Sequence, residues 1–383
     1  MKRILIIGSW NTTHVRRFIS VLIREAYTNL IIDAYDPRFE DSIKYDIPVN
    51  HVYSSGVKTN WFYKIRKIGT YFFERRKLNR LKNLLEINHY DLINIHQIPH
   101  NALEYVRVAH RCNTKIMLTP FGSDVLRVSK IYKKSLSRAF HEADYVSANL
   151  LTGFADKIKT QYNIPESKLI NLGYGSETIT AILEQKGKIN RKQQVAMLDI
   201  PYSNYYITCG YTASMAQRHS LMIEAIKANK DLLPKDYCVL IPLSYGPAKE
   251  QLKIELSTQC IEVGLNYRII EDYLTVEQVA ALRLITDIFI HIQPTDAYNA
   301  SLQEFILAGA KCINGKWLDY PSLERHGAPY YVCDSLEDLP KVLKGVLCNE
   351  LPELMISNDV IEEIEGNAWV KKIQQWITFY TNI

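Results

Sequence analysis

Short apolar runs alternate with amphipathic stretches along most of the chain. The run "RILIIG" (3–8) precedes a stretch at 13–26 whose apolar residues keep the spacing of a helix. Further apolar runs, with helical stretches between them, follow at 30–36, 90–97, 114–124 and 143–150. Near-continuous apolar strands that alternate with helices are typical of a parallel sheet with helices on both faces. The pattern predicts an α/β fold whose first domain is doubly wound.

A polar, basic segment interrupts this alternation and is interpreted as a linker at 186–204. A second series of apolar runs follows, at 205–212, 237–246, 267–272 and 287–293. The pattern therefore predicts two Rossmann-like domains, over 1–185 and 205–360, with a cleft between them. Residues 361–383 are expected to form a helix that packs back on the first domain. In open α/β sheets, ligands bind beyond the carboxyl ends of the strands, so the loops there carry the candidate residues.

Composition places the chain among globular proteins. Hydrophobic residues make up 47% and charged residues 23% of the 383 positions. The formal net charge of +5 is too mild to indicate a nucleic-acid-binding protein. Seven scattered cysteines without a CxxC pair indicate reduced thiols, no zinc site and a cytoplasmic location. No apolar run approaches the length that a bilayer requires.

The stretch "TDAYNASLQEFILAGA" (295–310) places two carboxylates, Asp296 and Glu304, just after an apolar run. Asn299 or Ser301 is expected to begin a helix there, and its first N–H groups would form an anion site. Glu304, expected in the first turn, could accept both hydroxyls of a ribose. Asp296 could reach sugar hydroxyls beyond the phosphates. The plainer interpretation is that an acid near a helix start favours the helix dipole and nothing more.

Two other loops of the second half carry candidate ligand contacts. "CGYTASMAQRH" contains Gly210 and Thr212, and Arg218 stands near the start of the next helix. A guanidinium beside a helix N-terminus suits a diphosphate, with a solvated arginine on a helix face as the alternative. "PLSYG", which includes Tyr245, is a small-residue loop that a ligand could approach closely.

The loops of the first half are less specific. "GSWNTTH" lacks the GxGxxG fingerprint, which argues against an NAD enzyme. Gly8 permits a tight turn there, and His14 is either a base or a residue at a helix start. In "GSDVLR", Ser123 or Asp124 is expected to cap a helix, and Asp124 is also free to point into the cleft.

The segment 61–85 combines eight Lys or Arg residues with interleaved aromatic residues. This composition suits the headgroup layer of an anionic bilayer, at about 1 kcal/mol per basic residue near the surface. It predicts contact with a membrane surface. The alternatives are a solvated helix packed by its aromatic residues and an RNA-binding patch.

Taken together, these motifs resemble the GT-B glycosyltransferases, chiefly glycosyltransferase family 4. Asp296 and Glu304, followed by "LAG", look like the E-x7-E motif of that family with Asp for the first Glu. "THVRRF", "DLINIHQ", "TPFGSDVLR" and "ADYVSANL" look like its acceptor domain. "GYTASMAQRHSLMIEAI" with "VLIPLSYG" is similar to the bacterial lipid-linked 4-acetamido-4,6-dideoxygalactose transferases. The resemblance covers nearly the whole chain.

The resemblance implies transfer of a sugar from a nucleoside-diphosphate sugar to a glycan or lipid-linked acceptor. The enzyme would act in bacterial surface glycan synthesis, at the inner face of the cytoplasmic membrane. Asp296 would act in catalysis on the donor sugar, and Glu304 would bind the ribose. The diphosphate would lie among a larger group of residues: Gly210, Thr212, Arg218, Tyr245, Asn299, Ala300, Ser301 and Leu302. Neither a metal nor a cofactor is expected, since the chain has no Asp-x-Asp motif.

Family 4 resemblance also implies retention of the anomeric configuration, whereas the 4-acetamido-sugar enzymes invert it. On the acceptor side the family has a His before the "GSD" segment, where this chain has Phe121. Asp124 and His14 are therefore the candidate catalytic groups there, and four other residues complete the acceptor side: Gly8, Asn11, Gly122 and Ser123. Two rival interpretations stay open, a non-catalytic GT-B-like subunit that binds a glycan or partner enzyme, and a nucleotide-sugar epimerase.

Overall fold

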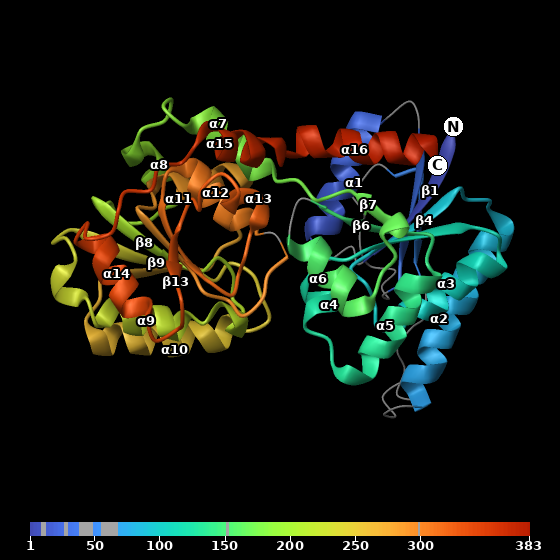
Figure 1. Cartoon of the computed structure of the whole chain (residues 1–383), viewed down its shortest axis with the longest axis horizontal. Coiled ribbons are helices and arrows are strands. Elements are labelled where there is room, and N and C mark those ends of the chain that lie inside the picture. The colour runs from blue at the N-terminus through green and yellow to red at the C-terminus, as the bar shows by residue number, and fades with distance from the viewer. Residues whose placement is uncertain (9–12, 27–29, 38–48, 55–67, 151–152, 298) are drawn as a thin grey trace. The chain divides into compact units, whose positions relative to one another are not determined.

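The computed structural model describes residues 1–8, 13–26, 30–37, 49–54, 68–150, 153–297 and 299–383. The chain divides into two compact units (Figure 1). Unit 1 comprises Met1–Gly175 and Trp369–Ile383, and unit 2 comprises Ser176–Ala368. The chain therefore passes from one unit to the other at two places.

Unit 1 is built on a seven-stranded parallel sheet with the order β3-β2-β1-β4-β5-β6-β7. Its strands are β1 (Lys2–Ile7), β2 (Leu30–Asp36), β3 (His51–Ser54), β4 (Leu92–His96), β5 (Lys115–Thr119), β6 (Tyr145–Ala148) and β7 (Leu169–Asn171). The register places Ile4 of β1 beside Ile32 of β2 and Leu92 of β4. All the strands point the same way, so their carboxyl ends share one edge of the sheet.

The helices of unit 1 are α1 (Thr13–Ala26), α2 (Ile68–Ile87), α3 (Ala102–Arg111), α4 (Ser123–Leu126), α5 (Lys130–Glu142), α6 (Gly153–Tyr162) and α16 (Trp369–Asn382). Helix α16, the last of the chain, lies along α1 (Figure 1). Phe18 of α1 packs against Trp376 of α16, and both are fully buried with Ile4 and Ile6 of the sheet. The apolar spacing of both helices thus covers one face of this sheet.

Unit 2 contains a six-stranded parallel sheet with the order β10-β9-β8-β11-β12-β13. Its strands are β8 (Tyr205–Cys209), β9 (Tyr237–Pro242), β10 (Tyr267–Ile270), β11 (Ile288–His291), β12 (Lys311–Gly315) and β13 (Tyr331–Cys333). Side chains alternate between two cores, so that Ile207 faces one and Tyr206 the other. Burial on both faces explains why these strands are almost continuously apolar.

The helices of unit 2 are α7 (Glu177–Gln185), α8 (Arg191–Met197), α9 (His219–Lys227), α10 (Lys249–Val263), α11 (Val276–Ile285), α12 (Ala300–Ala308), α13 (Pro321–Glu324), α14 (Leu339–Leu347) and α15 (Asn358–Gly366). Helices α9, α10 and α14 share a core with one face of the sheet. Helices α7, α8, α11, α12 and α15 contribute to the cores on the other.

The division differs from the expected domain boundaries. The first unit ends at Gly175 instead of 185, and α8 occupies part of the expected linker 186–204. The reason is packing, because α7 and α8 bury Ile182 and Val195 against unit 2. The predicted α/β fold class is confirmed. None of the described helices has the length and apolar character needed to cross a bilayer.

Candidate functional site

The carboxyl ends of β8, β11 and β12 lie at one edge of the unit 2 sheet because the strands are parallel. The loops that follow them converge on Gln293. Its Oε1 accepts hydrogen bonds from Gln217 Nε2 at 3.1 Å and Tyr211 OH at 3.4 Å. Its carbonyl accepts one from Trp317 Nε1 at 2.7 Å. Polar groups from three loops therefore meet where a ligand of an open α/β sheet is expected.

Asn299 caps α12 and ties its first turn to the sheet. Its Oδ1 accepts from Leu302 N at 3.0 Å, and its Nδ2 lies 3.0 Å from Tyr211 OH and 2.9 Å from His291 Nε2. His291 Nδ1 lies 3.0 Å from Asn314 Oδ1, which can only accept, so Nδ1 carries the proton and Nε2 accepts from Asn299. Burial lowers the pKa of His291, which favours this neutral form.

The first turn of α12 has backbone N–H groups that lack an acceptor in the described part of the chain. The helix begins at Ala300, and its Leu302 N–H group is committed to the cap. The Leu302 N–H group is thus not available to a diphosphate, contrary to the prediction from the sequence. Among the described residues, the N–H groups of Ala300 and Ser301 have no acceptor. At a helix N-terminus such groups carry a partial positive charge and bind anions.

Arg218 reaches this edge from the loop between β8 and α9. Its Nη1 donates to the carbonyl of Ile292 at 3.1 Å, and its guanidinium lies 5.7 Å from the centre of the Trp317 ring. Its φ of 62° lies in the left-handed region that favours glycine. The guanidinium is nevertheless a cation next to the loop that leads into α12.

Asp296 lies in that loop and is oriented by Tyr320. The Tyr320 hydroxyl donates to Asp296 Oδ2 at 2.7 Å. Burial raises the pKa of Tyr320 well above its ordinary value, so the phenol stays protonated and remains a donor. Asp296 itself is only partly buried, which leaves its carboxylate accessible.

Glu304, in contrast, is buried and ion-paired. Its Oε2 lies 3.1 Å from Arg283 Nε, and both side chains are 6% exposed. Its Oε1 accepts from Ser176 Oγ at 2.7 Å, and Arg283 Nη2 also donates to Ser301 Oγ at 3.2 Å. Because α12 begins at Ala300, Glu304 lies in the second turn and not in the expected first. A contact between Glu304 and a ribose stays a prediction.

The loops after β8 and β9 are joined to each other. Tyr245 O accepts from Thr212 Oγ1 at 2.8 Å and from Ala213 N at 2.7 Å. A Cβ at Gly246 would lie 2.4 Å from Ala213 O, so the close approach requires glycine. The Thr212 hydroxyl therefore links the two loops by a hydrogen bond, while the Tyr245 ring remains exposed.

Gln217 and His219 are buried beside Gly210 with unused polar atoms. Gln217 Oε1 and both ring nitrogens of His219 have no partner within the described ranges. A Cβ at Gly210 would lie 2.8 Å from His219 Nε2, and Gly210 has a φ of 64°. Burial lowers the pKa of His219 to about 4, so the imidazole is neutral near pH 7.

In unit 1, the Asp124 carboxylate links the loop after β4 to the loop after β5 by hydrogen bonds. It accepts from the backbone N–H groups of Ile98 at 2.7 Å, Phe121 at 3.0 Å and Gly122 at 2.8 Å. Burial raises its pKa while these bonds act in the opposite direction. Helix α4 begins at Ser123 with Gly122 as its cap, and neither Ser123 nor Asp124 caps it as expected. The geometry gives Asp124 a structural role.

The other predicted acceptor residues are only partly described. Gly8 follows β1, where a Cβ would lie 3.0 Å from Val15 Cγ1. Asn11 and the side chain of His14 lie outside the described residues, although the backbone of His14 belongs to α1. Their roles stay predictions.

His96, at the end of β4, was not predicted and lies beside Phe121. Its ring centre is 6.4 Å from that of Phe121, and its Nδ1 is hydrogen-bonded to Tyr174 OH. Its Nε2 is without a partner in the part of the chain that the structure describes. Burial lowers the pKa of His96 to about 3. The signal in the sequence was a histidine at the end of the apolar run "DLINIHQ".

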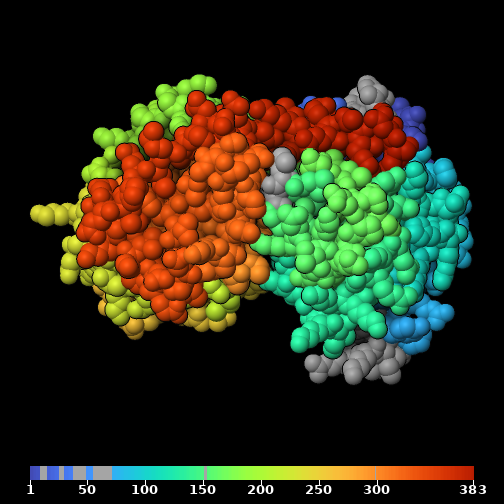
Figure 2. Space-filling view, viewed as in Figure 1, coloured from blue at the N-terminus to red at the C-terminus, as the bar shows by residue number. Residues whose placement is uncertain are grey.

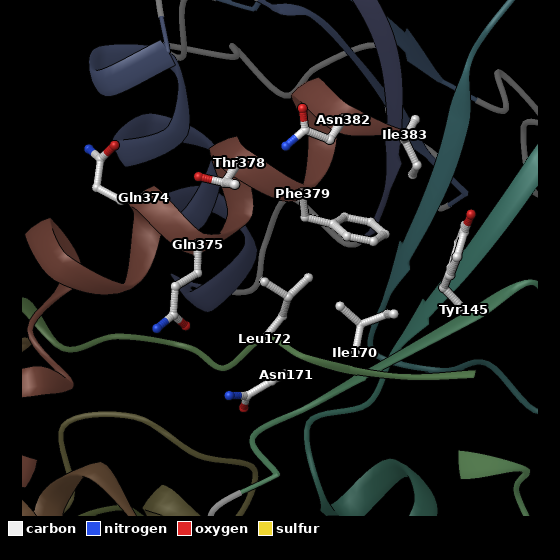
Figure 3. A pocket seen from close by; sticks show the side chains of 10 residues that line it. All are labelled: Tyr145, Ile170, Asn171, Leu172, Gln374, Gln375, Thr378, Phe379, Asn382 and Ile383. Carbon is white, nitrogen blue, oxygen red and sulfur yellow. The ribbon is translucent and has the colours of Figure 1, made fainter. Parts of the chain in front are cut away.

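Unit 1 also has a cavity of about 630 Å³ between β6, β7 and α16 (Figure 3). The side chains of Tyr145, Leu172 and Phe379 point toward it, with carboxamides such as Gln375 at its rim. None of its lining residues is a predicted site residue, and it lies at the edge strand β7. The described residues contain no cluster of three or more His, Cys, Asp or Glu suited to a metal ion.

Sequence reasoning missed most of the groups that organise the site in unit 2. Polar residues at the ends of apolar runs carried a signal, as His291 and Gln293 do in "DIFIHIQ". Tyr320 and Trp317 gave none, because only the pairing of β11 with β12 brings their loop beside Asp296.

A scan of protein families and a search of curated proteins both find no match for the sequence. Solved structures do match over the whole chain. A glycosyltransferase from Rickettsia africae has a TM-score of 0.75 at 13% identity, covering 100% of this chain and 98% of that one. HepE from Anabaena, solved with UDP and glucose, has a TM-score of 0.70 at 13% identity, covering 100% of both.

The lipopolysaccharide outer core galactosyltransferase WaaB gives a TM-score of 0.65 at 12% identity, covering 99% of each chain. At these identities the likeness establishes the fold. Each of the two units of this chain is a parallel α/β sheet, as the resemblance to GT-B enzymes implied. The chain has the GT-B fold.

Proposed function

We propose that the protein is a glycosyltransferase that moves a sugar from a nucleoside-diphosphate sugar to a glycan or lipid-linked acceptor. The observation that carries this proposal is the pair of N–H groups of Ala300 and Ser301 in the first turn of α12, which have no acceptor among the described residues, with the Arg218 guanidinium at the same sheet edge. Helix N-termini and arginine are the two protein groups best suited to a diphosphate. A fold shared with HepE, which was solved with UDP, makes a uridine nucleotide the first candidate.

The proposed chemistry relies on charge stabilisation. Negative charge builds on the diphosphate as the bond to the sugar breaks, and donors fixed in advance lower the barrier. Ala300, Ser301 and Arg218 would supply those donors. Asp296, oriented by Tyr320, would accept hydroxyls of the donor sugar. We propose a metal-independent reaction with retention of configuration, in the synthesis of a bacterial surface glycan.

The proposed acceptor is presented at a membrane surface. Of the basic aromatic segment 61–85, residues 61–67 lie outside the described residues, and the rest begins α2. Tyr71 and Phe72 are 60% and 49% exposed, and α2 also exposes basic side chains at Arg75, Arg76, Arg80 and Lys82. Part of α2, in light blue, is visible in Figure 2. Aromatic residues beside basic ones favour an anionic headgroup layer.

Lys77 does not belong to that surface. It is buried, donates to Glu74 at 2.8 Å and lies 4.1 Å from the centre of the Phe73 ring. The exposed basic residues of α2 are therefore fewer than the sequence suggested. We propose the inner face of the cytoplasmic membrane as the place of action.

The experiment is a melting screen of the full chain against UDP-, GDP- and TDP-sugars, followed by a transfer assay with the sugar of the nucleotide class that stabilises. One class should raise the melting temperature, and Arg218→Gln should reduce that rise. No response to any class would contradict the proposal. Nucleotide binding without hydrolysis or transfer would favour a non-catalytic GT-B-like subunit, an interpretation to which Phe121 at the place of the family histidine gives specific support.

A further inference from the structure

The two places where the chain passes between the units lie side by side. Ser176 N donates to Asn367 O at 2.9 Å, and Ser176 and Ala368 form a parallel bridge. One residue earlier, a Cβ at Gly175 would lie 2.7 Å from the Cα of Trp369. We call Gly175–Ser176 and Asn367–Trp369 the crossover pair. Both connections between the two units therefore belong to the crossover pair.

Helix α12 is hydrogen-bonded to both segments of the crossover pair. Ser176 Oγ donates to Glu304 Oε1 at 2.7 Å, and Asn367 Nδ2 donates to Gln303 Oε1 at 2.8 Å. Both bonds are buried, and Gln303 and Glu304 are 3% and 5% exposed. Buried polar groups are costly to leave unpaired, so both bonds are expected to persist.

Gln303 also bonds to the residue that caps α12. Its Nε2 donates to Asn299 O at 3.2 Å, and its backbone N donates to the same carbonyl at 3.3 Å. One side chain thus links the cap Asn299 to Asn367 of the crossover pair. The N–H groups of Ala300 and Ser301 directly follow that cap. Two hydrogen bonds therefore connect the proposed diphosphate site with the crossover pair.

We propose that Ser176, Gln303 and Asn367 are positioning residues of the nucleotide site, acting through Glu304 and the α12 cap. A nucleoside diphosphate on the first turn of α12 fixes the position of that helix, and the two buried bonds carry the restraint to the crossover pair. Coupling of this kind is reciprocal, so an ordered crossover pair also strengthens nucleotide binding. The identity of the ligand rests on the proposed function, whereas the hydrogen-bonded path does not.

Ser176 offers the sharpest variant because the chain contains a matched control. Ser176 caps α7 by accepting from Thr178 N at 3.1 Å, and Ser357 caps α15 by accepting from Val360 N at 3.3 Å. Ser176→Ala and Ser357→Ala thus each remove a helix cap, and of the two only Ser176 reaches Glu304. Ser176→Thr restores a hydroxyl and tests rescue.

The experiment is hydrogen exchange on the full chain with and without UDP, read in peptides over 173–179, 299–305 and 364–369. In the wild type, UDP should slow exchange in all three by about fivefold or more, the lower end of typical coupling between sites. In Ser176→Ala the protection over 299–305 should remain while that over 173–179 is lost. Ser176→Thr should recover it, and Ser357→Ala should match the wild type.

Two results overturn the inference while leaving the proposed function in place. One is UDP protection over 299–305 with unchanged exchange at the crossover pair in the wild type. The other is a Ser176→Ala variant whose crossover protection equals that of the wild type. If UDP leaves 299–305 unprotected and no nucleotide class stabilises the chain in the melting screen, the proposed function and the inference fail together.

Discussion

Arg283 and Glu304 form an ion pair inside unit 2, with Nε and Oε2 3.1 Å apart and both side chains 6% exposed. The guanidinium also lies 4.2 Å from the centre of the Phe305 ring. A buried pair adds little net stability over an apolar pair of the same shape, but removal of one partner strands a charge. The second acid of the E-x7-E-like motif therefore has a structural partner as well as a predicted ligand.

Glu304→Ala should lower the free energy of unfolding by about 3–5 kcal/mol, because it leaves Arg283 buried without its counter-charge. Urea unfolding at pH 7 measures the effect. The control is Asp334→Ala, which breaks the Lys316–Asp334 pair at 2.7 Å with side chains 69% and 68% exposed. That change should have little effect on the free energy of unfolding, because solvent screens an exposed pair. Equal losses in the two variants would contradict the buried pair.

Two substitutions of Arg218 separate its effect on the stability of the fold from its effect on nucleotide binding. Its φ of 62° strains any residue with a Cβ, by about 1–2 kcal/mol. Arg218→Gly should therefore be more stable to urea than Arg218→Ala by about 1 kcal/mol. Both variants lack the guanidinium, so both should bind a nucleoside diphosphate about tenfold more weakly, as expected for a charge-assisted hydrogen bond of about 1.5–3 kcal/mol.

Titration calorimetry of the two Arg218 variants measures the binding. Arg268→Gln is the matched control, since Arg268 is an exposed arginine on β10 of the same sheet. Its nucleotide affinity should equal that of the wild type. Unchanged affinity in both Arg218 variants would remove Arg218 from the diphosphate site.

The fold was readable from the sequence because its strands are buried on both faces. Runs such as "RILIIG" and "DIFIHIQ" predicted β1 and β11, and each is fully buried at its centre. The boundary near Gly175 could not be predicted, because α7 continues the first series of elements along the sequence and its packing on α11 is a tertiary contact. Helix α8 falls in the polar segment interpreted as a linker, and only its apolar contacts with α11 place it in unit 2.

The site was only partly readable. The cap at Asn299 follows from local sequence, and the structure has it. The partners of Glu304 and Asp296 do not, since Ser176 lies 128 positions from Glu304 and Tyr320 lies 24 from Asp296. Local patterns locate a helix start, whereas tertiary packing decides which side chains face each other.

His219 should make stability depend on acidity. Burial lowers its pKa in the folded state to about 4, against about 6.5 for an unperturbed histidine. Between these values the unfolded state binds the extra proton, so stability is complete above pH 6.5 and falls as the pH drops toward 4. The slope from this one group is about 1.4 kcal/mol per pH unit.

Urea unfolding of the wild type and of His219→Gln between pH 7 and about 4.5 measures that slope. Carboxylates also lower the free energy of unfolding at acid pH, but they do so equally in both proteins, so their contribution cancels in the comparison. The variant should lose about 1.4 kcal/mol per pH unit less than the wild type over this window. Parallel curves would mean that His219 is already protonated or accessible in the folded state.

Tyr320 should act on catalysis through Asp296. Tyr320→Phe removes the hydroxyl that donates to Asp296 Oδ2 at 2.7 Å and leaves the buried ring. We expect kcat/KM for sugar transfer to fall about tenfold, the equivalent of one hydrogen bond to a charged group. The Kd for the nucleoside diphosphate alone should not change, because the phosphates are held elsewhere. Tyr330→Phe is the control, since the Tyr330 hydroxyl bonds to Glu324 and not to Asp296.

The exposed aromatic pair on α2 should bind anionic membranes. Tyr71→Ser with Phe72→Ser removes two side chains that are 60% and 49% exposed, whose rings lie 5.7 Å apart. Co-sedimentation with phosphatidylserine vesicles should drop about tenfold or more, given about 1.5–3 kcal/mol for burial of each large apolar side chain. Binding of the wild type should weaken as salt rises, because the neighbouring arginines act through screened charge.

The matched control removes two exposed apolar residues from another helix. Ile254 and Ile261 of α10 are 69% and 67% exposed, and no run of basic side chains accompanies them. Ile254→Ser with Ile261→Ser should leave vesicle binding unchanged. If this control loses binding as the α2 variant does, apolar exposure in general drives adsorption. If neither loses it, α2 is a solvated helix, and the acceptor must be sought among glycans in solution.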